Sequence, residues 1–365
     1  MPEVTYSQAS LPPARFLVRL EHNETTLLNK HGDQLDGVIT LERFHKTDEL
    51  TGRLEDAARG AGVPFLRDPD TRRTAFGQLG ANTAIGRAKI PLPLTPGALE
   101  SDEAILEIVK TTLATQIDVT HPAPPYFTVD RLDDPWLEIN LRAAELAAQI
   151  AAGQRIAVFL CVSMNALAQP IFGEIARRYA ERVPGALIIF SVAGLDAEVA
   201  SEETRVAYLD GVVALRRGGL SVLTDRVGYL AVAAAALGAE GTAAGTRGYR
   251  KTPVEPPDPD ARRRAPSLKY VGPGRGAPVT LTKARGWVGT RYELPKCPVE
   301  GCTLEACEEA AFRRAHNAHL ASHDLRTAQD EPIEKTIERL KSSSIKAVQG
   351  YGAALEIALR RAQAA

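Results

Sequence analysis

The stretch Ile156-Ala-Val-Phe-Leu-Cys-Val162 is a short, apolar run that is rich in β-branched and aromatic residues. Runs of this length and composition are typical of strands that are buried on both faces, as in a parallel sheet. A helical pattern follows from Ala166 to Arg182, and a second apolar run, Ala186-Leu-Ile-Ile-Phe190, comes next. This order of strand, helix and strand is the repeating unit of a parallel α/β fold.

The same alternation extends in both directions along the chain. Other helical patterns cover Trp136–Ala152, Ser201–Arg217 and Tyr229–Leu237. Eight such units match the size of a closed barrel, whereas doubly wound sheets more often have fewer strands. The sequence therefore predicts a (β/α)8 TIM-like barrel over residues 1–250. The six further apolar runs are Arg15–Leu20, Gly37–Leu41, Val63–Leu66, Gln116–Val119, Leu220–Leu223 and Glu240–Ala244.

The composition limits both the compartment and the partners. A chain of 365 residues with 44% hydrophobic residues can bury a full-sized core. Its 44 basic and 45 acidic residues almost cancel, so any nucleic-acid site has to be a local patch. No apolar run is long enough to cross a bilayer, and the first ten residues lack the features of a signal peptide. We therefore expect a cytoplasmic protein.

The composition changes after the predicted barrel. Residues 253–266 are rich in Pro, Asp and Arg, and residues 272–276 contain a Gly-Pro-Gly turn. These features predict a connection over residues 251–290. The final segment, 291–365, then contains a cysteine cluster, a helical stretch from Glu308 to about Ala328, and a last helix from Ile333 to Ala364.

Three of the four cysteines lie within a short stretch and are followed by histidines. In a reducing compartment such clustering favours metal binding over disulfides, although buried or redox cysteines are the alternative. Thiolates and imidazoles are the usual ligands of tetrahedral zinc, and sulfur-rich sites are usually structural. In one straight helix from Glu308, His316 would lie about 13 Å from Cys307, so the chain would have to fold back. We predict a structural Zn²⁺ held by Cys297, Cys302, Cys307 and His316, with His319 and His323 as alternatives to His316.

Carboxylates follow two of the predicted strands. In barrels of this kind the chemistry lies at the carboxyl ends of the strands. Asp68 and Asp70 follow the third run, and Asp225 follows the seventh. Carboxylates in different environments suit general acid-base or nucleophilic chemistry, so we predict that these three are catalytic. The alternative is that Asp68 caps a helix and pairs with Arg72.

Cationic and aromatic side chains are expected at the same end of the barrel. Arg72, Arg226 and Arg247 follow three different runs, and guanidinium groups suit a phosphate or carboxylate ligand. Tyr126 lies in a proline-rich stretch after the fourth run and could stack on a flat ligand. We predict that these four residues bind substrate, and that Cys161 is a buried apolar side chain.

A barrel whose last strand is followed by a cysteine cluster and then by His316-Asn317 on a helix resembles the tRNA-guanine transglycosylase family, including its relatives that insert deazapurines into DNA. The pair Thr246-Arg247 is similar to the Thr-Arg that follows the nucleophile strand of that family. This chain departs from the family in its wider cysteine spacing, and Glu240 is the only acidic residue where the family has its nucleophilic aspartate. The resemblance implies a zinc-containing enzyme that exchanges a base in tRNA or DNA.

Other functions stay open at this level, including whether the protein is an enzyme. One is a non-catalytic nucleic-acid-binding component of a modification or defence system. Another is an unrelated barrel enzyme, such as an aldolase or a flavin enzyme; the absence of lysine from the predicted strands argues against a Schiff-base aldolase. The basic stretch for nucleic-acid contact comprises Arg262, Arg263, Arg264, Lys269, Arg275, Lys283 and Arg285, with Tyr270 and Trp287 among them.

Overall fold

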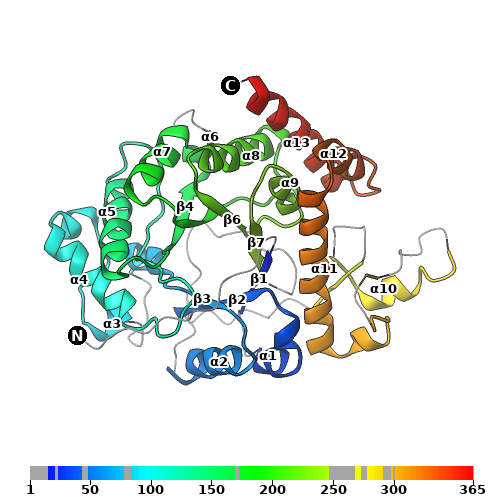
Figure 1. Ribbon diagram of the computed structural model, residues 1–365, viewed down its shortest axis with the longest axis horizontal. Coiled ribbons are helices and arrows are strands. Elements are labelled where there is room, and N and C mark those ends of the chain that lie inside the picture. The colour runs from blue at the N-terminus through cyan, green and yellow to red at the C-terminus, as the bar shows by residue number, and fades with distance from the viewer. Residues whose placement is uncertain are drawn as a thin grey trace.

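The computed structural model of the protein describes residues 15–20, 24–42, 48–77, 84–168, 172–245, 268–272, 278–290, 297–298 and 301–364. Its largest element is a sheet of seven parallel strands in the order β3-β2-β1-β7-β6-β5-β4. The sheet curls through 237° into a half-barrel (Figure 1). The strands are β1 Arg15–Arg19, β2 Gly37–Leu41, β3 Phe65–Asp68, β4 Ala157–Ser163, β5 Leu187–Ala193, β6 Ser221–Asp225 and β7 Gly241–Ala244.

Helices surround the half-barrel (Figure 1). Some of them begin where a side chain accepts a hydrogen bond from the backbone of the first turn, as do Ser101 before α4, Asp134 before α5 and Ser201 before α8. The helices up to β7 are α1 Thr25–His31, α2 Asp48–Gly60, α3 Ala84–Arg87, α4 Asp102–Leu113, α5 Pro135–Ile150, α6 Met164–Ala168, α7 Phe172–Arg182, α8 Glu202–Arg217 and α9 Leu230–Ala236.

Seven of the eight predicted strands are present, and the fourth prediction is wrong: Gln116–Val119 is not a strand. An irregular segment, residues 120–129, instead lies between the two edge strands. The N–H of Thr120 donates to the Phe65 carbonyl of β3, and the N–H of Ala157 in β4 donates to the Pro122 carbonyl. This segment contains three prolines, which have no N–H to donate, so it cannot form a regular ladder on both sides.

Apolar side chains fill both faces of the sheet, as the sequence of β4 predicts. One core lies between the sheet and the helices. A second, smaller core fills the inside of the half-barrel and includes Leu17, Phe159 and Leu223. The strands β1 and β7 pass very close to each other, because a Cβ on Gly241 would lie 2.1 Å from the Arg15 carbonyl oxygen. Only glycine fits at this position.

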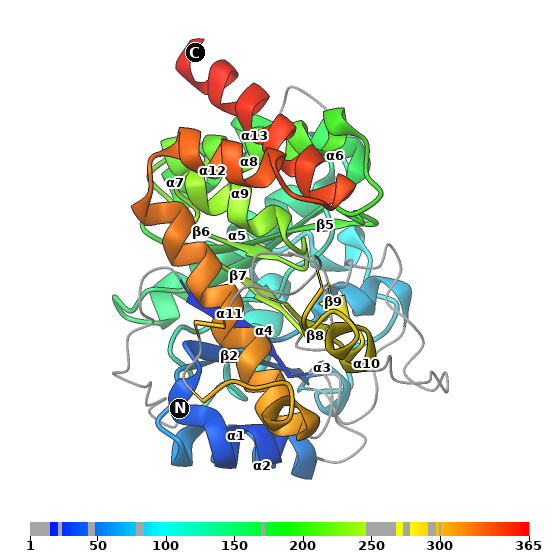
Figure 2. The same cartoon turned by 90° about the vertical axis from the view of Figure 1, so that its right-hand side faces the viewer.

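Within the described ranges, four more helices and a pair of short antiparallel strands follow the half-barrel. They are α10 Leu281–Arg285, α11 Ala310–Asp330, α12 Ile333–Lys341 and α13 Lys346–Ala364, with the antiparallel pair β8 Tyr270–Val271 and β9 Pro278–Val279. Helix α11 packs against β1, α1 and α9, and it runs along the side of the half-barrel from α12 to α1 (Figure 2). The single last helix expected over residues 333–364 is two helices, α12 and α13, which pack on each other. No helix in the described ranges has the length and apolar character that a membrane span requires.

Candidate functional site

Two carboxylates at the carboxyl end of the half-barrel share one buried arginine. Asp68 and Asp225 are the last residues of β3 and β6, and Arg19 is the last residue of β1. Nε and Nη2 of Arg19 donate to the two oxygens of Asp225 at 2.6 and 2.9 Å, and Nη1 donates to Oδ2 of Asp68 at 2.7 Å. These three side chains are 1–3% exposed. The carboxylates predicted as catalytic are therefore brought together, but as partners in a buried ion pair.

Tyr126 completes this group. Its hydroxyl donates to Oδ1 of Asp68 at 3.0 Å, and its ring stacks on Phe159 with the centroids 5.4 Å apart. Burial raises the pKa of Tyr126 well above its ordinary value, and the negative charge of Asp68 adds to this effect, so the hydroxyl keeps its proton. We call Arg19, Asp68, Asp225 and Tyr126 the Arg19 network. Burial would lower the pKa of Arg19, but Asp225 and Asp68 outweigh it and raise that pKa.

Asp70 lies beside this network, in the turn after β3. Its backbone is left-handed, with φ of 44°, a conformation that aspartate tolerates better than most residues. The Asp70 N–H donates to Oδ1 of Asp68, while its carboxylate accepts from Nε of Arg73 at 2.5 Å and lies 3.5 Å from Nε of Arg72. Burial would lower the pKa of Arg72, but neighbouring Cys161 and Asp70 raise it. Asp70 thus forms buried ion pairs with Arg73 and Arg72.

The remaining predicted binding residues differ in accessibility. Tyr126 is 5% exposed, and one face of its ring is already covered by Phe159. Arg226 follows β6 with φ of 56°; its side chain is half-buried and pairs with no carboxylate among the described residues. Arg247, with the preceding Thr246, lies outside the described residues.

Arg19 is the residue of this site that the sequence analysis missed. It lies inside a predicted strand, two residues after Leu17, so the alternation of a strand puts both side chains on the same face. A charged residue on a buried strand face requires a partner of opposite charge. The position of Arg19 in this strand therefore predicts a buried acidic partner for its side chain.

Cysteine and histidine side chains converge beside α11. The Sγ atoms of Cys297 and Cys302 lie 3.4 and 3.1 Å from Nδ1 of His316, and these three ligand atoms all lie within 4.8 Å of one another. Cys307 is buried next to them, with its Sγ 3.9 Å from that of Cys302. The group Cys297, Cys302 and His316 could hold a metal ion. We call it, with Cys307, the Cys/His cluster.

The short strand β8 positions the imidazole of this cluster. Nε2 of His316 lies 2.9 Å from the Val271 carbonyl oxygen, and the Tyr270 ring stacks on the imidazole with the centroids 4.8 Å apart. If Nε2 carries the proton and donates to that carbonyl, the lone pair of Nδ1 points at the two sulfurs, as in many metal sites. Asn317 accepts from the Val271 N–H and donates to the Lys269 carbonyl. The pair His316-Asn317 therefore joins α11 to β8.

The basic stretch lies only partly within the described residues. There, Tyr270 is buried against His316, Arg285 forms an ion pair with Glu308, and Lys283 lies 5.5 Å from the centre of the Trp287 ring. Arg262, Arg263, Arg264 and Arg275 lie outside the described ranges.

No family model, curated protein or solved structure matches this chain significantly.

Proposed function

We propose that the protein is a zinc-containing member of the α/β barrel enzymes that resembles the tRNA-guanine transglycosylases and acts on a nucleobase within a nucleic acid. The observation that carries this proposal is the combination of two features in one fold. Carboxylates gather at the carboxyl ends of parallel strands, and a Cys/His cluster follows the last strand of the half-barrel. In this interpretation residues 120–129 take the place of the fourth strand of a (β/α)8 barrel.

Zinc suits the donor set of the Cys/His cluster. With the usual ligand distances, a tetrahedral zinc places two sulfurs about 3.8 Å apart and a sulfur about 3.6 Å from an imidazole nitrogen. The corresponding separations here are 3.9 Å between Cys302 and Cys307 and 3.1–3.4 Å from the sulfurs of Cys302 and Cys297 to His316. Cys307 is outside the group of three ligand atoms that all lie within 4.8 Å of one another, so its sulfur has to move inward to become the fourth ligand. We propose that these four residues hold the ion, and that its role is to tie the C-terminal segment to α11.

The Arg19 network would supply the chemistry. In base exchange a carboxylate oxygen attacks C1′ of the sugar while the base leaves with the electrons of the glycosidic bond; the incoming base later displaces the carboxylate. Arg19 forms ion pairs with Asp68 and Asp225 and orients both carboxylates at the carboxyl end of the half-barrel. Both carboxylates are almost fully buried, so the residues that cover them at the carboxyl end of the half-barrel must move when substrate binds. Arg226 is the more accessible cation for a phosphate of the substrate.

A direct test is the incorporation of labelled guanine into tRNA or into DNA by the zinc-loaded protein. We expect incorporation by the unaltered protein and a loss of about a hundredfold or more in Asp68→Asn and in Asp225→Asn, because each substitution removes a carboxylate to which we assign the chemistry. Asp133→Asn is the matched control, because the Asp133 side chain is 80% exposed. Thermal unfolding of each variant separates loss of chemistry from loss of fold. Equal incorporation by all variants would refute the catalytic role.

One observation favours a second candidate, a non-catalytic nucleic-acid-binding component. Asp68, Asp225 and Asp70 are all buried in ion pairs, which is also how structural carboxylates behave. This candidate predicts that tRNA or DNA binds in a salt-sensitive manner without any base exchange. The labelled-guanine assay, run beside a binding assay on the same samples, distinguishes the two candidates.

A further inference from the structure

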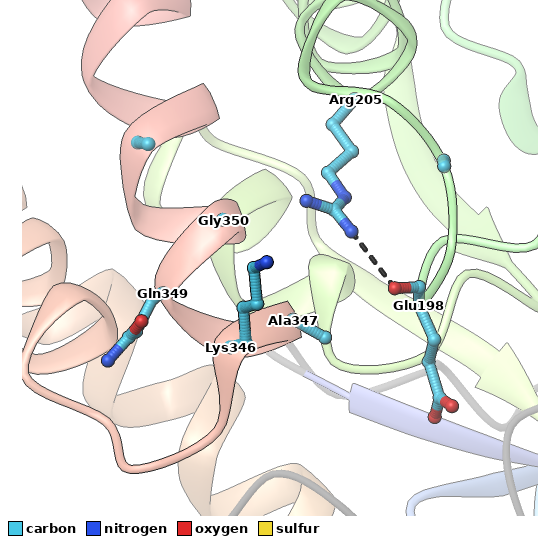
Figure 3. A pocket seen from close by; sticks show the side chains of 8 residues that line it. Glu198, Arg205, Lys346, Ala347, Gln349 and Gly350 are labelled. Atoms are coloured by element: carbon cyan, nitrogen blue, oxygen red, sulfur yellow. Dashed lines mark hydrogen bonds between the residues drawn. The ribbon is translucent and has the colours of Figure 1, made fainter.

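A cleft of about 510 Å³ lies between helix α13 and the loop that leads from β5 into α8 (Figure 3). This loop, residues 194–201, follows the carboxyl end of β5. The cleft is therefore on the same end of the half-barrel as the Arg19 network, but outside the ring of strands. Its lining includes Glu198, Arg205, Lys346 and Gly350.

Arg205 is the central side chain of this cleft. It is only 8% exposed, and its Nε and Nη2 donate to the carbonyls of Ala197 and Glu198 at 3.0 Å each. The guanidinium also lies over the Tyr351 ring, 5.1 Å from its centre. These contacts hold the group in one orientation. In Figure 3 the remaining nitrogen, Nη1, points away from the loop and toward α13.

Helix α13 has a glycine, Gly350, where Nη1 of Arg205 approaches it. A Cβ added to Gly350 would lie 2.2 Å from Nη1 of Arg205, so a residue with a side chain at this position would displace the guanidinium. Glycine is less favourable than alanine in a helix interior, so its presence here needs a reason. The reason is the space that it leaves for a charged group at the base of the cleft.

The two cations of the cleft have no ion-pair partner in the described residues. Neither Arg205 nor the exposed Lys346 forms an ion pair with any carboxylate in the described ranges of the chain. Glu198 also lines the cleft, but Figure 3 shows its carboxylate directed away from Arg205. Lys346 is the first residue of α13, a helix of 19 residues whose first N–H groups have no partner within the helix. A buried arginine, a lysine and a helix N-terminus together attract an anion.

We propose that this cleft binds a phosphate group, held by Nη1 of Arg205, the Lys346 ammonium group and the first turn of α13. A phosphate has enough acceptor oxygens for all three donors at once, and arginine is the side chain best suited to it. The proposal does not depend on the activity proposed for the Arg19 network. A phosphate monoester and the phosphodiester of a nucleic acid share this chemistry.

The test is a titration of the full-length protein with inorganic phosphate at constant ionic strength, followed by calorimetry or by the rise in unfolding temperature. We expect binding to weaken about tenfold in Arg205→Gln and about threefold in Lys346→Gln. Lys346 is exposed, so its variant tests the site even if Arg205→Gln does not fold. Lys335→Gln, at an exposed lysine of α12, is the matched control and should bind as the unaltered protein does.

The source of the phosphate is distinguished by two further probes, a 5′-mononucleotide and a dinucleoside monophosphate, which carries only a diester. Preference for the mononucleotide supports a small phosphorylated ligand, and equal binding of both supports a nucleic-acid backbone. The proposal is overturned if phosphate binds no better than chloride, or if Lys346→Gln and Arg205→Gln both bind phosphate as the control does.

Discussion

The Arg19 network and the Cys/His cluster both bury polar side chains, but they differ in the partners that these side chains have. In the network, the guanidinium of Arg19 meets the carboxylates of Asp68 and Asp225, so opposite charges are paired within the protein. In the cluster, donor atoms of Cys297, Cys302 and His316 converge in a group that could hold a metal ion. The first region can therefore form from the chain alone. The second has the donor atoms of a metal site, so a bound cation would balance its thiolates.

The largest effect is expected from breaking the network at its centre. Arg19→Leu leaves two buried carboxylates without a cation and should lower the free energy of unfolding by about 3–5 kcal/mol. Urea denaturation measures this loss. Arg131→Leu is the control, because Arg131 pairs with Asp133 at the surface and should change stability by less than about 1 kcal/mol. If Arg19→Leu costs no more than the control, the network is not a buried ion pair in solution.

Removing the metal should have the next largest effect. At a zinc concentration about 100 times its dissociation constant, the ion should stabilise the protein by ~2.7 kcal/mol, and a chelator should remove this stabilisation. Elemental analysis should find about one zinc per chain, lost in Cys302→Ser and His316→Ala.

His323→Ala is the matched control for the metal site, because His323 lies on the same helix but is exposed. It should keep its zinc. Zinc retained in Cys302→Ser and His316→Ala would contradict the assignment of the ligands.

His121, at the amino end of the half-barrel, is expected to make the stability of the protein depend on pH. Burial and the nearby Arg155 and Arg15 lower the pKa of His121 from 6.5 to about 4. Between these values the unfolded chain binds the proton and the folded protein does not, so the free energy of unfolding falls as the pH falls from 6.5 to 4. The loss should be about 1–3 kcal/mol.

Urea denaturation at pH 7 and pH 5 measures this dependence, with a chelator present so that metal loss does not contribute. His121→Gln should have a smaller loss between the two pH values than the unaltered protein. His323→Gln, at an exposed histidine, should show the same loss as the unaltered protein. An unchanged pH dependence in His121→Gln would show that another group is responsible.

The smallest effect tests the edge of the network. Tyr126→Phe removes one hydrogen bond to Asp68 but leaves the bonds from Arg19 and the Asp70 N–H, so it should cost about 1–2 kcal/mol. Tyr179→Phe is a matched control: this tyrosine is also buried, and its hydroxyl has no hydrogen-bond partner among the described residues. It should cost nothing measurable. Equal losses in the two variants would mean that the Asp68 hydrogen bond contributes no stability.

Much of the half-barrel could be predicted because its signals are local. An apolar run such as β4 is buried on both faces whatever its neighbours are, and Ser201 caps α8 within its own turn. The segment 120–129 could not be assigned in this way. Its prolines exclude a regular ladder of hydrogen bonds. Hydrogen bonds to β3 and β4 nevertheless hold it between these two edge strands, and β3 is distant from it in sequence.

Local sequence patterns were enough to predict the order of strands and helices, the positions of Asp68 and Asp225 at strand ends, and the gathering of cysteines near His316. The pairing of charges depends instead on the folded chain: Arg19 pairs with two carboxylates, 49 and 206 residues away. The tertiary structure also selected His316 over His319 and His323 as the imidazole beside the sulfurs. The physical reason is that local patterns reflect interactions within a few residues, whereas buried charges and ligand atoms are matched only by packing of the whole chain.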